Sequence, residues 1–531
     1  MNSFPAEDFE KSKRDGHIQK YRSECRKVKA LRPVVQTWKK TDAARIQRKT
    51  THRPERISAF SWLFQQKIAM LMRELIVTTL RLARRIFMAS DTVFDLVIHN
   101  GTILTVNDDF DIVRQGTLCI QNGRIAAISV HEPGEQPPPA KATIDAGGGI
   151  VMPGLVNTHT HLPMSMFRGL ADDRPLMEWL KETIFPAEAA HVHPETVFRA
   201  TQLACAEMIL SGTTTCCDGY FLENSVARAV QLSGMRAVLG QGVIDYPAPG
   251  VPDPARNIAH AARFVETWRN ADPLITPAVF CHSPYTCSRE TLTKAKALAR
   301  SQGILFQIHA AETRTERDLF LREHGVTPIR YLDGLGLLDA GTLLVHAVWT
   351  DETDIRRISA GGAVISHNPE SNMKLASGIA PVEKFLAAGI PVGLGTDGCA
   401  SNNNLDLFQE MDTAAKLHKV NTLDPTVMDA RTVIRMATAM GARAIGLGGV
   451  VGTLEIGSQA DVIIIDTGKP HMTPLYHPAS QIVYTAKASD VRTVVVAGKV
   501  IMADGRILTL DLAEILAEVR KIARRINKRQ P

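Results

Sequence analysis

Two histidines one residue apart, His159 and His161, follow a short apolar run that begins after Gly154. In an extended strand, residues i and i+2 face the same side, so two imidazoles at the end of a strand can reach one ion. Two surface histidines on a strand end would give the same pattern. The His-x-His pair therefore indicates a metal site only if other parts of the chain supply further ligands.

Eight strand-like runs alternate with helical patterns through the middle of the chain. Eight such units over roughly 300 residues predict a (β/α)8 barrel, the TIM barrel. Six runs end on His or Asp, at the edge where barrel enzymes carry their active sites. The runs cover residues 150–157, 212–218, 236–244, 275–282, 304–309, 342–346, 363–367 and 391–397.

The terminal residues of these runs form a set that suits a hydrolytic metal centre. Neutral imidazoles and a carboxylate can bind a divalent ion and leave one position for water. Glu312 follows His309 by three residues and can turn back to carry a proton from that water to a leaving group. The set comprises His159, His161, His282, His309, His346, His367 and Asp397.

With these motifs the chain resembles the amidohydrolase superfamily, and within it the 5-methylthioadenosine/S-adenosylhomocysteine deaminases and their chlorohydrolase relatives. The resemblance covers about residues 92–510. It implies an α/β fold, a distorted (β/α)8 barrel with a small β-sandwich built from both flanks. The matching segments are Pro153-Gly-Leu-Val-Asn-Thr-His-Thr-His161, His282-Ser-Pro-Tyr285, His309-Ala-Ala-Glu312, Val345-His346, Ser366-His-Asn-Pro369, Gly395-Thr-Asp-Gly398 and Ala400-Ser-Asn-Asn403.

The resemblance also implies roles for single residues. One divalent metal per subunit, zinc or alternatively iron, would be bound by His159, His161, His309 and Asp397. Glu312 would carry the proton, His346 would contact the hydrolytic water, and Asp397 would accept a proton as the intermediate collapses. Substrate contacts would come from Glu188 at the ribose hydroxyls, from His282, Glu312 and Ser401, and from Trp179 as a wall of the pocket.

The activity expected from the resemblance is hydrolytic deamination of 5′-methylthioadenosine, S-adenosylhomocysteine or adenosine to the inosine analogue and ammonia. A related ring hydrolase, such as a guanine deaminase or a triazine chlorohydrolase or aminohydrolase, is the alternative, and Glu188 argues against it because those substrates lack a ribose diol. Gln241 stands where some relatives carry an Arg for a charged 5′ tail, which weakens the case for S-adenosylhomocysteine. A noncatalytic descendant is disfavoured because every ligand position is filled.

Four further regions are expected around these motifs. Residues 1–90 form a basic extension with an amphipathic helix near 60–87, unless translation starts at Met88. Residues 91–150 and 450–510 form the composite sandwich, 151–449 the barrel and 511–531 a final helix. The extension holds 21 Lys and Arg against 8 Asp and Glu, although the whole chain has a net charge of only +6, so the remainder is acidic.

The charge distribution and the cysteines limit which classes of binding partner and which compartment we expect. Residues 91–531 are acidic overall and therefore offer no basic face for nucleic acid. The chain also lacks an uncharged apolar run of 18 residues, so no membrane span is predicted. The eight cysteines of the chain lack a Cys-x-x-Cys pair and mostly lie in apolar runs, which is typical of a reduced, cytoplasmic protein. We expect a homo-oligomer that acts on a small nucleoside.

Overall fold

The structure is a computed structural model that describes residues 93–130, 135–170 and 172–527. All elements below belong to the compact unit Thr92–Pro531. The basic extension of residues 1–90, the helix expected near 60–87 and the alternative start at Met88 lie outside the described residues.

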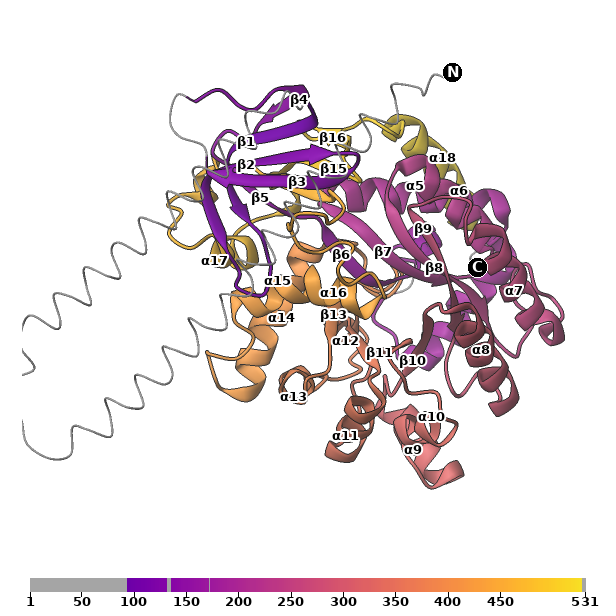
Figure 1. Cartoon of the computed structure of the whole chain (residues 1–531). Coiled ribbons are helices and arrows are strands. Elements are labelled where there is room, and N and C mark those ends of the chain that lie inside the picture. Colours follow the sequence, from indigo (N-terminus) through magenta and orange to yellow (C-terminus); the bar gives the residue numbers. More distant parts are fainter. Residues whose placement is uncertain (1–92, 131–134, 171, 528–531) are drawn as a thin grey trace, which may run out of the picture. The chain divides into compact units, whose positions relative to one another are not determined.

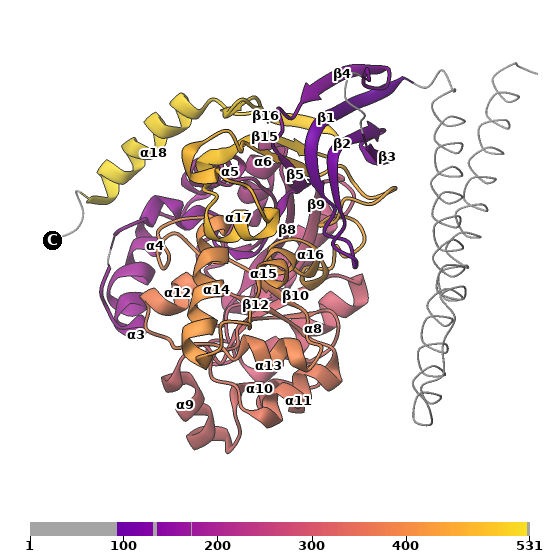
Figure 2. The same ribbon diagram turned by 90° about the vertical axis from the view of Figure 1, so that its left-hand side faces the viewer.

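Eight parallel strands form the barrel that the sequence predicts, in chain order around the sheet (Figures 1 and 2). Their apolar side chains fill the barrel interior, where Val156, Val238 and Val345 belong to one buried cluster. The strands are β6 (Leu155–Thr160), β7 (Thr213–Tyr220), β8 (Arg236–Val243), β9 (Ile275–Cys281), β10 (Phe306–Ala310), β11 (Thr342–His346), β12 (Val364–His367) and β13 (Val392–Leu394).

Side chains and backbone together join the first and last strands. The Asn157 amide donates to Thr396 Oγ1 at 2.8 Å and accepts from the Thr396 backbone N–H at 3.1 Å. The Asp397 backbone N–H donates to the His159 carbonyl at 3.0 Å. The closing contacts therefore bring the first His-x-His residue directly beside the last carboxylate.

Residues 150–157 do not form the single barrel strand that the sequence predicts. The run divides at Gly154 into β5 (Ile150–Pro153), which pairs with β1 and β14 (Val462–Ile465), and the barrel strand β6. Periodicity could not show this break because both halves are buried and apolar. The barrel therefore begins at Leu155.

Gly154 is required at this junction, and we expect Gly154→Ala to lower the free energy of unfolding by about 1–3 kcal/mol. An added Cβ would overlap Oγ1 and Cγ2 of Thr214 and would lie 2.7 Å from its Cβ. Gly334→Ala is the matched control, since nothing lies within 4 Å of a Cβ there. Equal denaturation midpoints for the two variants would contradict this account.

The two flanks of the chain combine in one nine-stranded sheet outside the barrel (Figure 1). Its hydrogen bonding joins N-terminal and C-terminal strands through the β5–β14 pair. Besides β5 and β14 the sheet contains β1 (Phe94–Leu104), β2 (Ile112–Gln121), β3 (Arg124–Val130), β4 (Ala140–Asp145), β15 (Val491–Val496), β16 (Lys499–Ala503) and β17 (Arg506–Ile507).

Asn-Gly and Asp-Gly pairs between apolar runs predict tight turns between strands, and the flanks contain three such pairs. One of these three predictions is wrong. Asn122-Gly123 and Asp504-Gly505 do connect antiparallel strands, with positive φ at both residues of each pair. Asn100-Gly101, by contrast, lies inside β1 at a break in its register with β2. A Cβ on Gly101 would lie 2.7 Å from Val151 Cγ2, so this glycine serves a bulge where β5 approaches closely.

Helices separate most barrel strands and cover the barrel (Figure 2). The segment after β6 is a short 3-10 turn, η1 (Leu162–Phe167), and then a continuous helix with a π turn in its middle: α3 (Leu176–Glu178), η2 (Trp179–Ile184) and α4 (Phe185–His191). The others are α5 (Pro194–Leu210), α6 (Glu223–Ser233), α7 (Asn257–Trp268), α8 (Arg289–Gln302), α9 (Arg314–His324), α10 (Pro328–Gly334), α11 (Glu352–Gly361), α12 (Pro369–Lys374), α13 (Val382–Ala387), α14 (Leu407–Thr422), α15 (Ala430–Met436), α16 (Ala439–Ala444), α17 (Pro478–Tyr484) and α18 (Leu512–Asn527).

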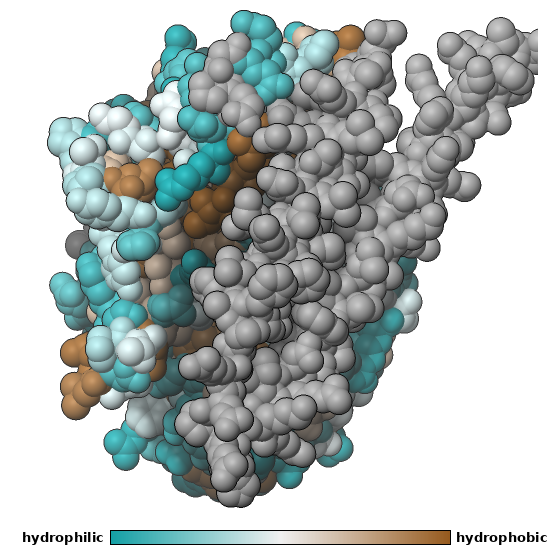
Figure 3. Space-filling model, turned by 60° about the vertical axis from the view of Figure 1, so that its left-hand side comes forward, coloured by the Kyte–Doolittle hydropathy of each residue, from teal (hydrophilic) through white to brown (hydrophobic). Residues whose placement is uncertain are grey.

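The described surface is mixed in character. On the face shown in Figure 3, hydrophilic residues cover much of the described part, with smaller apolar areas between them. Among the described residues, no helix combines the length and the apolar character that a bilayer crossing requires.

Candidate active site

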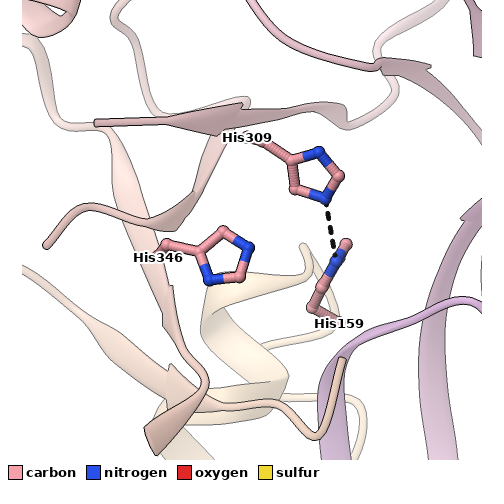
Figure 4. Close-up of side chains that lie close together, drawn as sticks. All are labelled: His159, His309 and His346. Carbon is pink, nitrogen blue, oxygen red and sulfur yellow. Dashed lines mark hydrogen bonds between the residues drawn. The ribbon is translucent and has the colours of Figure 1, made fainter. Parts of the chain in front are cut away.

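Three histidines and an aspartate gather where strands β6, β10 and β13 end. His159 Nε2 lies 3.2 Å from His309 Nε2, and Figure 4 shows these two rings facing each other with His346 beside them. Asp397 Oδ1 lies 3.5 Å from His159 Nε2 and 3.4 Å from His161 Nε2. The structure thus brings the four side chains expected from the resemblance close together, in two groups of potential ligands that share His159 and not in one group of four.

The spacing of these atoms fits a common divalent ion. Donor atoms about 2.0–2.1 Å from a tetrahedral zinc lie about 3.3–3.4 Å from one another. Three of the six pairs among the four expected ligands, at 3.2, 3.4 and 3.5 Å, match that edge length. Two groups of potential ligands share His159, one with His309 and His346 and the other with His161 and Asp397.

Neighbouring groups orient the imidazoles. His161 Nδ1 lies 2.6 Å from the Gly219 carbonyl, so Nδ1–H donates and Nε2 is free to bind an ion. His346 Nδ1 lies 2.9 Å from Asn372 Oδ1, which turns Nε2 toward Glu312 Oε2 at 3.9 Å. In neutral His161, the ring nitrogen that faces the cluster is therefore unprotonated.

Burial also sets the charges of the cluster. It lowers the pKa of His159 to about 4 and, together with His159, holds the pKa of His309 well below its ordinary value. Burial raises the pKa of Asp397, but the hydrogen bond with His159 and the adjacent His161 outweigh it and hold this pKa well below its ordinary value. Neutral imidazoles and an ionised carboxylate are the forms that bind metal.

Two of the functional residues have strained backbones. His346 has a φ of 72° and Asp397 a φ of 62°, both in the left-handed region that non-glycine residues rarely adopt. Ser371 Oγ donates to Asp397 Oδ2 at 2.7 Å, and the Gly398 N–H donates to Oδ1 at 2.7 Å. Such strain costs on the order of 1–3 kcal/mol and is held by the surrounding contacts.

Glu312 is positioned by a second carboxylate. Glu316 accepts from the backbone N–H groups of Ala311 at 2.9 Å and of Glu312 at 2.8 Å. This is a capping arrangement at the start of α9, where Thr313 is the N-cap. Burial raises the pKa of Glu312, which suits a group that must take up and release a proton.

A pocket of about 720 Å³, including its open mouth, lies above the cluster. Its lining contains every catalytic and substrate-binding residue expected from the sequence, together with all the proposed ligands except His159. The expected residues in the lining are His161, Trp179, Glu188, His282, His309, Glu312, His346, Asp397 and Ser401. Most of the others are apolar or aromatic, as in ordinary small-molecule sites.

The helix with the π turn carries one wall of the pocket. Trp179 opens the π turn and Glu188 lies one helical segment further, in α4. Glu188 is buried, and Tyr220 Oη donates to its Oε1 at 2.5 Å. Burial raises the pKa of Glu188 to about 7, against the effect of this hydrogen bond.

Two residues that end predicted strands do not line the pocket. His367 Nε2 lies 3.1 Å from His418 Nε2 of α14, within the protein interior. Asp218 Oδ1 accepts from the Leu162 N–H at 2.7 Å and from Thr160 Oγ1 at 2.8 Å, so it holds the backbone around His161. A His or Asp at the end of a predicted strand therefore does not by itself show that the residue lines the pocket.

Sequence reasoning missed Tyr220, Ser371, Asn372 and Glu316. Tyr220 was missed because the predicted run stopped at Asp218, two residues before β7 ends. Glu316 had a usable signal, since Thr313-Arg-Thr-Glu316 has the capping-box spacing. Ser371 and Asn372 had none, because their partners lie 26 residues away in the chain.

Residues 150–501 match the model of the Amidohydrolase family. The chain belongs to this family. A 5-methylthioadenosine/S-adenosylhomocysteine deaminase from Syntrophobacter fumaroxidans is 49% identical over 432 residues, which cover 81% of this amidohydrolase and 98% of the relative. A 5′-deoxyadenosine deaminase from Methanosarcina mazei is 45% identical over 432 residues, with the same coverage of both chains.

A solved structure supports the same placement. The crystal structure of an adenosine deaminase from Xanthomonas campestris with bound zinc superposes with a TM-score of 0.81 at 36% identity. The match covers 83% of this amidohydrolase and 100% of that chain. The barrel and the separate sheet are therefore the architecture of a known deaminase.

Proposed function

We propose that this amidohydrolase hydrolytically deaminates adenosine-type nucleosides, with 5′-methylthioadenosine, S-adenosylhomocysteine or adenosine converted to the inosine analogue and ammonia. The observation that carries the proposal is one pocket that holds both the His and Asp cluster and the buried Glu188. A carboxylate can accept hydrogen bonds from both hydroxyls of a ribose diol. The names of the three relatives support the same chemistry.

In this proposal His159, His161, His309 and Asp397 hold one divalent ion. Zinc is proposed because the edge lengths fit it and the Xanthomonas campestris enzyme contains it, and iron is the alternative to test. When bound, such an ion supplies a nucleophile near neutral pH by lowering the pKa of water to about 7.

The protein's own groups move the protons. Glu312 takes a proton from the water and delivers it to purine N1, which makes C6 electrophilic. Asp397 accepts the remaining hydroxyl proton and passes it to the C6 amino group, so that the C6–N bond breaks, the C6 carbonyl forms and ammonia leaves. His346 Nε2, which lies 3.9 Å from Glu312, contacts the attacking water, while His282, Trp179 and Ser401 hold the base and sugar.

A substrate panel tests the function. We expect ammonia release from adenosine, 5′-methylthioadenosine and 5′-deoxyadenosine. For guanine and a chlorotriazine we expect kcat/KM to be at least about 100-fold lower, because they lack the ribose hydroxyls that would occupy the remaining acceptor sites of the buried Glu188. A higher kcat/KM for guanine or the triazine would favour the alternative ring hydrolase.

The same panel should rank the 5′ substituents. The described lining contains no Lys or Arg, and Gln241 is engaged with the Glu223 backbone N–H at 3.3 Å. A homocysteine carboxylate would therefore meet no cation in the pocket. We expect kcat/KM to be about tenfold or more lower for S-adenosylhomocysteine than for 5′-methylthioadenosine, since an unmatched charge costs more than about 1.4 kcal/mol.

We further propose a cytoplasmic homo-oligomer that has no nucleic-acid partner. The seven cysteines of the described residues are all free and buried, which supports a reducing compartment. Size-exclusion chromatography with light scattering tests the oligomeric state.

A further inference from the structure

The end of strand β7 touches three different parts of the site through three consecutive residues. Asp218 accepts from the two residues that flank His161, the Thr160 hydroxyl and the Leu162 backbone N–H. The Gly219 carbonyl accepts from His161 Nδ1 at 2.6 Å, and Tyr220 Oη donates to Glu188 Oε1 at 2.5 Å. One strand therefore ties the metal-binding end of the pocket to the carboxylate at its other wall.

Tyr220 is buried at the end of β7 and packs against two neighbouring rings. Its side chain is only 4% exposed, and its ring lies 6.1 Å from the His161 ring and 5.4 Å from the Phe221 ring. Among the described residues, Tyr220 is the one hydrogen-bond donor that reaches the Glu188 carboxylate. An O–H to carboxylate bond of this length is a strong, charge-assisted one.

The state of Glu188 matters because the ionised carboxylate accepts at both oxygens, whereas in the neutral acid one oxygen carries a proton and acts as a donor. Burial favours the neutral acid, and the Tyr220 bond opposes burial. The other titratable side chains of the pocket are His161, His282, Tyr285, His309, Glu312, His346 and Asp397, and none of them forms a hydrogen bond with Glu188 among the described residues.

We propose that Tyr220 is a positioning and specificity residue that holds Glu188 in place as an acceptor for the ribose 2′ and 3′ hydroxyls. This inference rests on the proposed nucleoside function. Tyr220 uses one lone pair of Oε1 and leaves the remaining acceptor sites of the carboxylate to the diol. It selects ribonucleosides without touching the reacting C6 atom.

Tyr220→Phe tests the proposal, with adenosine and 2′,3′-dideoxyadenosine as substrates. At pH 7 we expect KM for adenosine to rise about tenfold or more while kcat changes little, because a charge-assisted hydrogen bond is lost from the binding site. KM for the dideoxynucleoside, which has no diol, should not change. Tyr331→Phe in α10 removes the same oxygen outside the pocket and should leave both KM values as they are.

The pH dependence gives a readout that a loss of folding would not produce. The pKa of Glu188 is about 7, so KM for adenosine in the wild type should rise as the pH falls below that value. Without the Tyr220 donor the pKa increases further, and the rise in KM should begin at higher pH. Infrared difference spectra of the carboxylic acid C=O band, with Glu188→Gln as the blank, follow this titration without any substrate.

The outcomes separate the two proposals. An unchanged infrared titration of Glu188 in Tyr220→Phe, or equal KM increases for both nucleosides, would overturn the role of Tyr220. A wild-type enzyme that releases no ammonia from any adenosine-type nucleoside would overturn the function. Even in that case the infrared titration shows whether Tyr220 controls the pKa of Glu188, because it needs no turnover. If Tyr220 acts through Glu188, Tyr220→Phe should cause no further loss of binding in a protein that already carries Glu188→Gln.

Discussion

Replacing Glu312 by Gln is expected to lower kcat by about 10²–10⁴-fold, the usual contribution of a positioned general acid and base. The amide has nearly the same shape as the carboxylic acid but cannot take a proton from water and pass it to the purine. The backbone of residue 312 should stay in place because Glu316 accepts its N–H at 2.8 Å. The loss should therefore appear in kcat, measured by ammonia release at saturating nucleoside.

The metal content of Glu312→Gln should remain that of the wild type, since Glu312 is outside both groups of potential ligands. Elemental analysis of the purified variant checks this. Glu323→Gln, an exposed change on α9, is the matched control and should keep wild-type kcat. Turnover within tenfold of the wild type in a fully metal-loaded Glu312→Gln would remove Glu312 from the mechanism.

The barrel could be predicted well from the sequence because it depends on local patterns. Each strand is a short apolar run, and its final residue must lie at the same edge of the barrel as all other final residues. This rule placed seven His and Asp side chains at one edge, and the choice of His159, His161, His309 and Asp397 among them came from the family resemblance. Three of the six pairs among these four residues have ligand atoms 3.2–3.5 Å apart.

The parts that the sequence did not reveal depend on contacts between distant segments. Periodicity cannot distinguish one long buried strand from two shorter ones, so the break at Gly154 was missed. An Asn-Gly pair predicts a turn, but at Asn100-Gly101 pairing with three other strands outweighs that local preference. Tyr220 is recognisable only through Glu188, which lies 32 residues earlier in the chain.

Removal of the metal with a chelator should abolish turnover, with a fall of at least about 10³-fold, and should also destabilise the fold. Among three buried imidazoles and a buried carboxylate, three pairs of ligand atoms lie 3.2–3.5 Å apart, and without a cation the lone pairs of these atoms face one another. An ion that binds only the folded state stabilises it by about 4 kcal/mol when its free concentration is about 1,000 times its Kd. The unfolding midpoint should therefore fall on chelation.

One equivalent of Zn²⁺ per chain should restore both turnover and the unfolding midpoint. The same reconstitution with Fe²⁺ under anaerobic conditions tests the alternative metal. Glu312→Gln is the informative control, because it should lose and regain stability like the wild type although it remains inactive. Asp397→Asn should regain neither property, since the neutral amide cannot replace the ionised carboxylate of Asp397, whose pKa is held well below its ordinary value by His159 and His161 despite burial. An apo enzyme that still deaminates nucleosides, or a stoichiometry of two ions per chain, would contradict a single catalytic ion at His159, His161, His309 and Asp397.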